Sequence, residues 1–381
     1  MNILHLYPKS DYFTGAAIQL LDLARGLARR GHHVVVATRP AESWAERCRH
    51  ANLPYYAIPM RSEIDLHSVL PLIRIIRRHH VEVVHCHKGK ARTLALMAGL
   101  FVRIPVLILN RGVSFPLDRF QRLGYTTKRV TAVVAVCEAI KRALVASGVQ
   151  GQKIHVIYSG TDTTRFHPRV DGGAVRQELN FKSGCFVFTQ IGVRSWKGND
   201  DTIDAMAWLA GKAPQARLLV VGARNPESLY QRAERSRMRG VVRVIGYRQD
   251  IPEILAASDC CVDASYAGLG ITGTLREALA VGRPVIATEL EGNSELVIHD
   301  RTGLLVPARR PEALAHAMLR MIDEPDHART MATEGLRRVQ TMFSTAVKVE
   351  RAEALYRTLL DCRTSSRGPA PAEPGGASVV P

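Results

Sequence analysis

The feature that most constrains the fold of this chain is a repeated alternation of short apolar segments with amphipathic ones. In the first half, segments such as NILHLY, HVVVAT and VLILN are nearly continuous runs of apolar and β-branched residues, which is typical of strands buried on both faces. Between them, stretches such as residues 16–30 carry Leu and Ala at helical spacing. The alternation restarts with CFVFTQIG and ARLLVVG. We therefore predict an α/β fold with two Rossmann-like, doubly wound parallel-sheet domains that face each other across a cleft.

The length of the chain and one polar segment set the expected domain limits. The chain has 381 residues, more than twice the usual domain size. The polar segment contains Gly172 and Gly173, and the C-terminus is rich in Pro, Gly and Ser. The expected parts are an N-terminal domain over residues 1–168, a linker over 169–183, a C-terminal domain over 184–345, a helix over 346–362 that crosses back, and a disordered tail over 363–381.

Positive charge is concentrated in the first half of the chain. The net charge is +17; residues 1–168 hold 24 Lys and Arg against 10 Asp and Glu, and the remainder holds 28 against 25. This imbalance predicts an anionic partner for the N-terminal domain, such as a phosphorylated substrate or a membrane surface. Nucleic acid is not favoured, because aromatic residues are only 6% and no segment resembles a recognition helix.

Several absences favour a cytoplasmic protein. The opening MNILHLYP lacks the charged start of a secretion signal. The longest apolar stretch, residues 93–109, is interrupted by Arg103 and Pro105 and is shorter than a membrane-spanning helix requires. The seven cysteines include no C-x-x-C pair, which predicts reduced thiols rather than disulfides or zinc.

The segment GLGITG, residues 268–273, has the spelling G-x-G-x-x-G of a dinucleotide-binding loop, and Glu289 follows at the distance of a ribose-binding acid. That loop usually lies in the first strand-to-helix turn of its domain, whereas here it follows the fourth predicted strand of the second domain. A dehydrogenase is therefore not favoured. A glycine-rich turn before a helix still presents N–H groups to an anion or a sugar hydroxyl. Glu277, one turn into that helix, is either a ribose ligand or a solvent-facing residue.

Two cations follow the first predicted strand of the second domain. Arg194 and Lys197 lie in the segment IGVRSWKG, and paired cations suit a diphosphate leaving group. The alternative is an exposed basic loop. Both this segment and GLGITG follow strands of one parallel sheet, so both are expected at its carboxyl edge, where open α/β sheets bind ligands.

Two longer segments resemble a known family. LREALAVGRPVIATELEGNSELVIHDRTGLLVP (residues 275–307) and VAVCEAIKRALVASGVQGQKIHVIYSGTDTTRFHP (residues 134–168) are similar to segments of the retaining GT-B glycosyltransferases of family 4. Shorter segments at residues 191–198 and 245–265 match further parts of that family, so the resemblance covers most of residues 1–360. It implies a GT-B fold and the retaining transfer of a sugar from a nucleotide diphosphate sugar to a hydroxyl.

The resemblance also implies roles for individual residues. Arg194 and Lys197 would neutralise the donor diphosphate, and Glu277 would hold the donor ribose. Further donor contacts would come from the loops at Gly15, at Gly246, Tyr247 and Arg248, and at Gly270, Ile271, Thr272 and Gly273. No D-x-D is present, and the family requires neither a metal ion nor a cofactor beyond the nucleotide sugar. The basic N-terminal domain would bind an anionic or lipid-linked glycan, such as a lipopolysaccharide, and contact an anionic membrane at the inner face of the cytoplasmic membrane.

The chain departs from the family at two positions. The family often has two glutamates separated by seven residues; Glu277 matches the second, but Leu269 occupies the place of the first, which normally contacts the donor sugar. The family often has a histidine where this chain has Asn110 and Arg111. Arg111 is the candidate to bind an acceptor phosphate or the donor sugar there, and the strand-end histidines at 85 and 87 are alternative cleft residues. A nucleotide-sugar epimerase of the same fold and a non-catalytic glycan- or anion-binding descendant stay open as alternatives.

Overall fold

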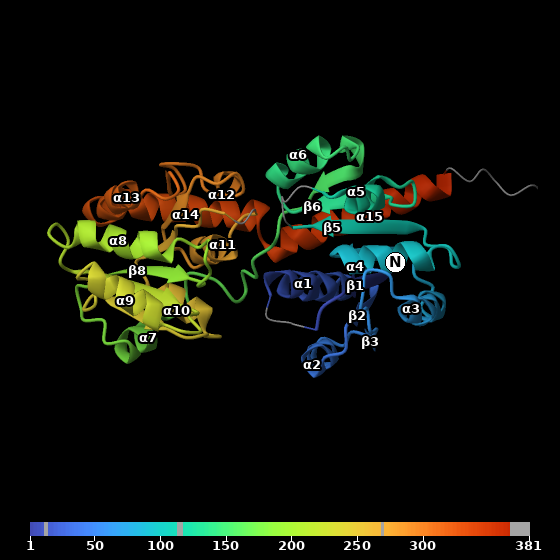
Figure 1. Ribbon diagram of the computed structural model, residues 1–381, viewed down its shortest axis with the longest axis horizontal. Helices are drawn as coiled ribbons and strands as arrows, with labels where there is room; N and C mark the ends of the chain where they lie inside the picture. Colours follow the sequence, from blue (N-terminus) through green and yellow to red (C-terminus); the bar gives the residue numbers. More distant parts are fainter. Residues whose placement is uncertain (11–13, 113–116, 268–269, 366–381) are drawn as a thin grey trace, which may run out of the picture.

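The computed structural model describes residues 1–10, 14–112, 117–267 and 270–365 of the chain. They form two parallel sheets, one of seven strands and one of six, each covered by helices (Figure 1). Every strand pairing within the two sheets is parallel. The predicted α/β fold with two doubly wound domains is confirmed.

The N-terminal sheet and its helices alternate along the chain as the sequence pattern predicts. Their bounds are β1 (Asn2–Tyr7), α1 (Gly15–Arg29), β2 (His33–Thr38), α2 (Glu42–His50), β3 (Tyr55–Ala57), α3 (Leu66–Arg78), β4 (Val83–His87), α4 (Gly89–Ala98), β5 (Val106–Arg111), α5 (Arg119–Thr126), β6 (Ala132–Ala135), α6 (Glu138–Ala146), the 3-10 turn η1 (Gly151–Lys153) and β7 (Ile154–Val156).

The C-terminal sheet repeats the arrangement, and its last strand is followed by three long helices. Its elements are α7 (Gly173–Glu178), β8 (Phe186–Ile191), α8 (Asn199–Leu209), β9 (Ala216–Val221), α9 (Glu227–Arg235), β10 (Val242–Ile245), α10 (Ile251–Ala257), β11 (Cys260–Asp263), α11 (Gly273–Ala280), β12 (Val285–Thr288), α12 (Asn293–Leu296), β13 (Leu304–Val306), α13 (Pro311–Asp323), α14 (Pro325–Met342) and α15 (Thr345–Ser365).

Strand order determines where each sheet can bind a ligand. The orders are β3-β2-β1-β4-β5-β6-β7 and β10-β9-β8-β11-β12-β13. The order reverses direction between β1 and β4 in the first sheet and between β8 and β11 in the second. In open α/β sheets the crevice for a ligand lies beyond the carboxyl ends of the strands at such a reversal. The loops that follow β8 and β11 are therefore the first places to look for a site.

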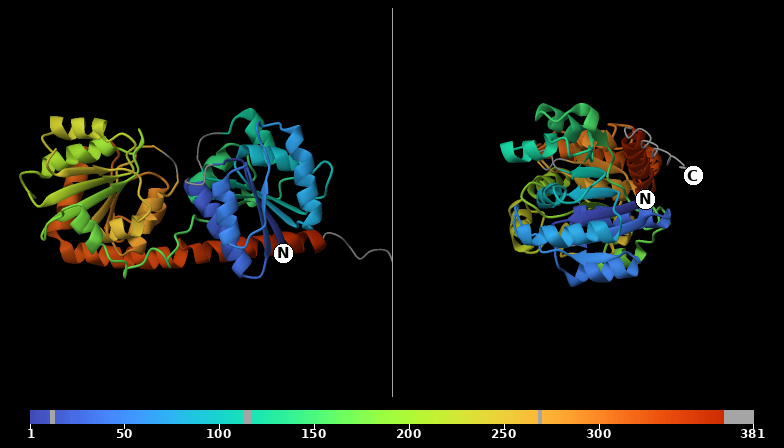
Figure 2. Two further views of the ribbon diagram at one scale, coloured as in Figure 1. Left: turned by 90° about the horizontal axis from the view of Figure 1, so that it is seen from below. Right: turned by 90° about the vertical axis from the view of Figure 1, so that its right-hand side faces the viewer.

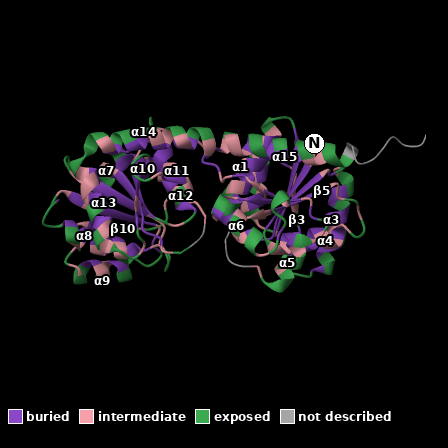
Figure 3. Cartoon of the chain, turned by 90° about the horizontal axis from the view of Figure 1, so that it is seen from above, coloured by how far each residue is buried: buried purple, intermediate pink, exposed green. Residues whose placement is uncertain are grey.

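Both faces of the N-terminal sheet are buried. Successive residues of β1 belong to different cores: Leu4 and Leu6 pack with α3, α4 and α6, whereas Ile3 and Tyr7 pack with α1 and α15. Alternate side chains of a strand point to opposite faces, and both faces here are covered, which explains the continuous apolar sequence of the strand. Buried residues accordingly follow the strands of both sheets in Figure 3.

The C-terminal helix α15 returns to the N-terminal sheet. Together with α14 it extends beneath both domains in Figure 2, and it packs on α1 and β5. Val349 fills the space above Gly26, where an added Cβ would lie 2.3 Å from Val349 Cγ2. The segment expected as a linker contains the short helix α7, which packs on α10. The exact domain limits stay a prediction. Among the described helices, none is both long and apolar enough to cross a membrane.

Candidate functional site

The turn between β8 and α8 is held tightly against the end of β11. Gly198 lies in the left-handed region at φ +63°, and an added Cβ would come within 2.0 Å of the Ala264 carbonyl oxygen. The backbone N–H of Tyr266 donates to the Trp196 carbonyl at 2.9 Å. Only glycine fits at position 198, so the loop that bears Lys197 is fixed beside the strand at which the sheet order reverses.

Lys197 makes a largely buried ion pair at this point. Its Nζ lies 2.8 Å from Oδ2 of Asp263, the last residue of β11, and the two side chains are 18% and 2% exposed. Burial would raise the pKa of Asp263, but the Lys197 ammonium and Ser265 outweigh it, so the pKa is held below its ordinary value. The ammonium is therefore anchored at the carboxyl edge of the sheet before any ligand binds.

Arg194 has a different environment from Lys197. Its exposed guanidinium donates to the Val193 carbonyl at 3.1 Å. It lines a hollow of about 520 Å³ together with Asp200 and Asp201 at the start of α8. Burial and the neighbouring carboxylates raise the pKa of Asp201. The structure thus holds one cation of the pair inward and leaves the other at the surface of the same loop.

The loop that precedes α11 is positioned by the segment after β12. A Cβ on Gly292 would come within 2.6 Å of the Gly270 carbonyl carbon, so the two backbones are in close contact. Asn293 is buried, and its Oδ1 accepts the Thr272 N–H at 3.3 Å. Thr272 is the N-cap of α11 and makes no side-chain capping bond. Gly268 and Leu269 lie outside the described residues. The consequence of Leu269 for the contact with the donor sugar therefore stays a prediction.

Glu277 lies one turn into α11, and its carboxylate turns back toward the start of the helix. Glu277 Oε1 is 3.9 Å from the position that a Cβ on Gly273 would occupy. Burial raises the pKa of Glu277, and the neighbouring Arg276 opposes that rise. A partly buried carboxylate beside a helix N-terminus can accept two hydroxyl protons from a diol. The alternative of a solvent-facing Glu277 is not favoured by this environment.

The loop after β10 contributes one exposed aromatic residue and one internally paired cation. The Gly246 carbonyl accepts the Gly222 N–H at 3.1 Å, which ties the loop to the end of β9. Arg248 makes ion pairs with Glu178 and Asp250, both at 2.5 Å, and these bonds raise its pKa. Tyr247 is 66% exposed. Arg248 therefore shapes the loop, and Tyr247 is the member whose side chain faces outward.

On the N-terminal side, Gly15 begins α1 and is exposed, and no atom of the described residues lies within 4 Å of its Cβ position. Arg111 ends β5, and its guanidinium carbon lies 5.9 Å from the centre of the Tyr125 ring. The loop that precedes α11 reaches this edge directly, because a Cβ on Gly270 would lie 3.7 Å from the Gly112 carbonyl oxygen. Ile271 packs on the cores of both domains. The carboxyl ends of the two sheets therefore meet where the loop at Gly270 and Ile271 reaches Gly112.

The strand-end histidines belong to the protein interior. His85 and His87 are 2% and 7% exposed. His85 Nδ1 lies 2.6 Å from the Tyr356 hydroxyl of α15, and His87 Nε2 lies 3.1 Å from His5 Nδ1. The three histidines lie close enough to share one metal ion, and burial, together with the Lys348 charge, lowers their pKa values and keeps the rings neutral. Because a ring nitrogen of each already bonds to the Tyr356 hydroxyl or to a neighbouring histidine, we assign the cluster to packing.

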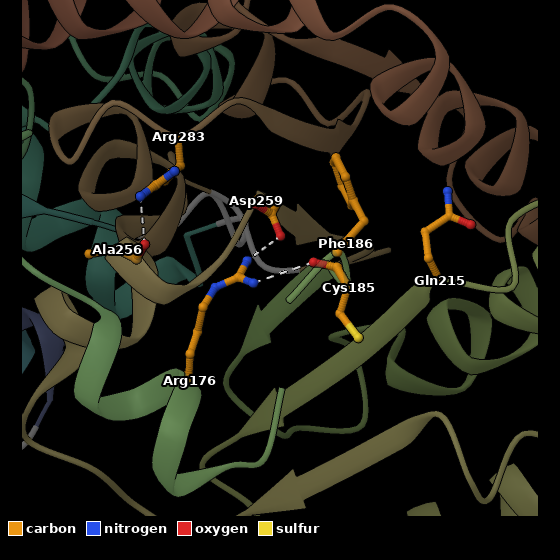
Figure 4. A pocket seen from close by; sticks show the side chains of 8 residues that line it. Arg176, Cys185, Phe186, Gln215, Ala256, Asp259 and Arg283 are labelled. Atoms are coloured by element: carbon orange, nitrogen blue, oxygen red, sulfur yellow. Dashed lines mark hydrogen bonds and ion pairs between the residues drawn. The ribbon is translucent and has the colours of Figure 1, made fainter. Parts of the chain in front are cut away.

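A second hollow, of about 450 Å³, lies at the opposite end of the C-terminal sheet (Figure 4). Two guanidinium groups line it, but both donate hydrogen bonds to other groups of the protein. Arg176 Nε donates to the Ala257 carbonyl at 2.8 Å and its Nη2 donates to Asp259 at 2.5 Å. Arg283 Nη2 donates to the Ala256 carbonyl at 2.5 Å. These bonds hold α7 and α10 on the sheet, and the hollow is remote from the carboxyl edge.

Glu295 of α12 caps a helix of the other domain. Its two carboxylate oxygens accept the Glu138 and Ala139 N–H groups of α6, each at 2.8 Å. Negative charge at a helix N-terminus is stabilising, and Cys137 at the N-cap provides no side-chain bond. Sequence analysis missed this contact between the domains, because the two partners lie more than 150 residues apart.

We expect Glu295→Ala to lower the thermal unfolding midpoint. Loss of a helix cap costs about 1–2 kcal/mol, which corresponds to about 2–8 °C for a domain of this size. The matched control is Glu291→Ala, because Glu291 is 71% exposed and its ion pair among the described residues is a 3.4 Å contact with Arg142. Differential scanning calorimetry of both variants checks the expectation; equal midpoints would show that the Glu295 contact adds nothing.

Comparison with known proteins identifies the family from both halves of the chain. Residues 13–165 match the family described as Glycosyltransferase Family 4, and residues 185–324 match Glycosyl transferases group 1. The chain is 28% identical to the putative glycosyltransferase EpsD of Bacillus subtilis over 343 residues, 83% of this chain and 88% of that protein.

Two further proteins agree with the assignment. The UDP-Gal:alpha-D-GlcNAc-diphosphoundecaprenol alpha-1,3-galactosyltransferase of Escherichia coli is 24% identical over 310 residues, 77% of this chain and 79% of that protein. The structure of Anabaena HepE in complex with UDP superposes with a TM-score of 0.82 at 22% identity, covering 94% of this chain and all of that one. The fold is GT-B, and the chain belongs to the family 4, group 1 glycosyltransferases.

Proposed function

We propose that the protein transfers a sugar from a nucleoside diphosphate sugar to a hydroxyl with retention of anomeric configuration. The observation that carries the proposal is Lys197, which Asp263 holds at the reversal of strand order, the usual ligand position in such a sheet. Glu277 and the start of α11 follow β11, the neighbouring strand at that reversal. HepE binds UDP, and the Escherichia coli relative uses UDP-Gal, which supports a nucleotide-sugar donor.

In the proposed reaction the bond between the anomeric carbon and the diphosphate breaks, and a bond to the acceptor oxygen forms on the same face of the sugar. The acceptor proton passes to an oxygen of the departing diphosphate. Lys197 and Arg194 neutralise the charge that develops there, Glu277 holds the ribose, and Tyr247 borders the base. Gly15 and the N–H groups of Gly270–Gly273 supply main-chain contacts. Arg111 lies at the acceptor side. These cations replace the charge that a metal ion would otherwise supply.

We further propose that the acceptor is anionic and lipid-linked, such as a lipopolysaccharide precursor. Between residues 61 and 130 the chain holds thirteen Lys and Arg against four Asp and Glu. Helices α3 and α5, which lie on the face opposite α15 (Figure 3), expose Leu66, Phe120 and Leu123, and Phe101 is exposed shortly after α4; each is more than half exposed. Exposed apolar side chains in a segment rich in Lys and Arg suit an anionic bilayer surface. The diphosphoundecaprenol acceptor of the Escherichia coli relative supports this proposal.

Replacing Phe120 and Leu123 together by Ser should weaken binding to anionic vesicles by at least about tenfold, because each buried apolar side chain contributes roughly 1.5–3 kcal/mol. Flotation with phosphatidylglycerol and phosphatidylcholine vesicles measures the effect. Trp208→Ser is the control, since Trp208 is 51% exposed on the other domain. Equal flotation of the wild type with both lipids would contradict the membrane proposal.

Transfer itself is tested by incubation with candidate nucleotide sugars, with and without lipid-linked acceptors. We expect product only when an acceptor is present, with the anomeric configuration of the donor by NMR, and unchanged rates in EDTA. Conversion of the donor alone into an epimer would instead support the epimerase alternative. A product of inverted configuration would contradict retention.

A further inference from the structure

Arg276 of α11 is a buried cation whose hydrogen bonds are incompletely satisfied. It is 5% exposed, in a helix whose other residues near it are largely apolar. Nη1 donates to the Ile271 carbonyl at 3.1 Å, and Nε has no hydrogen-bond partner among the described residues. Burial lowers the pKa of Arg276 to about 10, and Glu277 counteracts this. A buried charge of this kind is unfavourable unless nearby groups compensate it, so its surroundings need an explanation.

The guanidinium lies near both Glu277 and the loop that precedes α11. Nη2 is 3.7 Å from the Cβ position of Gly273, and Glu277 Oε1 is 3.9 Å from the same point. Both charged groups therefore lie close to the first residue of α11, a glycine whose missing side chain leaves that space open. Nη1 meanwhile reaches back to the loop, five residues earlier in the chain.

We propose that Arg276 is a positioning residue of the donor site: it fixes the main chain at Ile271 and keeps the Glu277 carboxylate in its charged form. The inference rests on the proposed function, since it assigns Glu277 to the donor ribose. It also accounts for a charged residue in a helix that otherwise reads L-x-E-A-L-A, a position at which an apolar side chain would pack without a desolvation penalty.

The charges around Glu277 give the expected direction of the effect. Burial raises the pKa of Glu277; Arg276 and Arg165 lower it, and Asp22 of α1 raises it. Around Arg276 lie Glu277 and the Lys348 ammonium of α15. Without Arg276, the largest opposing charge is lost and the pKa of Glu277 rises further. Protonation would then remove the charge that accepts the ribose hydroxyls, so donor affinity should fall at a higher pH than in the wild type.

The test compares Arg276→Met and Arg276→Lys with the control Arg283→Met, which removes a partly buried guanidinium at the other end of the same domain. One readout is UDP affinity by calorimetry between pH 8 and pH 6, with GDP and ADP in parallel. We expect the affinity of Arg276→Met for UDP to fall more steeply than that of the wild type as the pH is lowered over this range, because Glu277 then takes up its proton at a higher pH. The wild type, Arg276→Lys and Arg283→Met should change much less.

The second readout needs no ligand. Hydrogen exchange of the free protein should be about tenfold faster over residues 270–275 in Arg276→Met, and close to wild type in the other two variants. A wild-type pH profile and wild-type exchange in Arg276→Met would overturn the inference. If the wild type binds none of the three nucleotides, the proposed donor role of the site fails. In that case unchanged exchange overturns the inference about Arg276, and faster exchange supports its role in fixing the loop.

Discussion

Replacing Lys197 by Met should reduce turnover by about two to three orders of magnitude, the effect of removing one preorganised group that stabilises developing charge. The ammonium is already held beside β11 by Asp263 at 2.8 Å, so it requires no rearrangement when the diphosphate departs. The same substitution leaves Asp263 charged and buried, and breaking a buried pair from one side costs roughly 3–5 kcal/mol. We therefore expect a lower thermal midpoint together with the loss of turnover.

Two further variants separate these effects. Lys197→Met combined with Asp263→Asn should recover much of the stability without recovering turnover, because the amide needs no cationic partner. Arg194→Met should lower turnover with an unchanged midpoint, since Arg194 is exposed and its hydrogen bond within the described part of the chain is to the neighbouring Val193 carbonyl at 3.1 Å. Steady-state kinetics and calorimetry on the three proteins give both quantities. Wild-type turnover in folded Lys197→Met would remove the diphosphate role.

Glu277→Gln should weaken donor affinity by about 10- to 100-fold, because hydrogen bonds to a charged group contribute roughly 1.5–3 kcal/mol. The pH dependence has a definite sign. Burial raises the pKa of Glu277, so the wild-type carboxylate takes up a proton at a higher pH than an exposed glutamate does. Donor affinity in the wild type should therefore decline as the solution is acidified, and Glu277→Gln should be weak at every pH.

Glu289→Gln is the matched control for this prediction. Glu289 is exposed, and it occupies the ribose position that a dinucleotide-binding interpretation of GLGITG would assign. Unchanged donor affinity in Glu277→Gln, measured by calorimetry, would contradict the role of Glu277. A loss confined to Glu289→Gln would point back to the dinucleotide interpretation.

The fold was predictable because buried parallel strands carry a local signature. Runs such as those of β1 and β2 are apolar on both faces, and the helices between them have one apolar face, so each element is recognisable from adjacent residues alone. Strand β3 is not predicted from the sequence. It is only three residues long, and none of its residues is buried. A strand that short, at the edge of the sheet, shows no run of apolar residues that would identify it.

The site was predictable in outline and not in its contacts. Strand ends locate the loops at Lys197 and Gly273, because the carboxyl ends of parallel strands share one edge. The partners come from elsewhere: Asp263 is 66 residues from Lys197, and Glu178 is 70 residues from Arg248. Such pairs depend on how the strands are ordered in the sheet, which the sequence pattern does not specify.

The histidines at the end of β4 also show that the local sequence does not reveal contacts between distant residues. Their places at the end of β4 suggested residues open to a ligand, but α15 crosses back and sets the Tyr356 hydroxyl against His85. That contact spans 271 residues, so local reasoning could not foresee that helix α15 covers His85.

The most direct test of the proposed donor site is calorimetry of the wild type with UDP, GDP, ADP and CDP, repeated with Lys197→Met and Glu277→Gln. A diphosphate held by Lys197 and a ribose held by Glu277 predict that at least one of these nucleotides binds, and that each substitution weakens its binding at least about tenfold. Absence of binding by all four nucleotides, or equal affinity in the wild type and both variants, would contradict it.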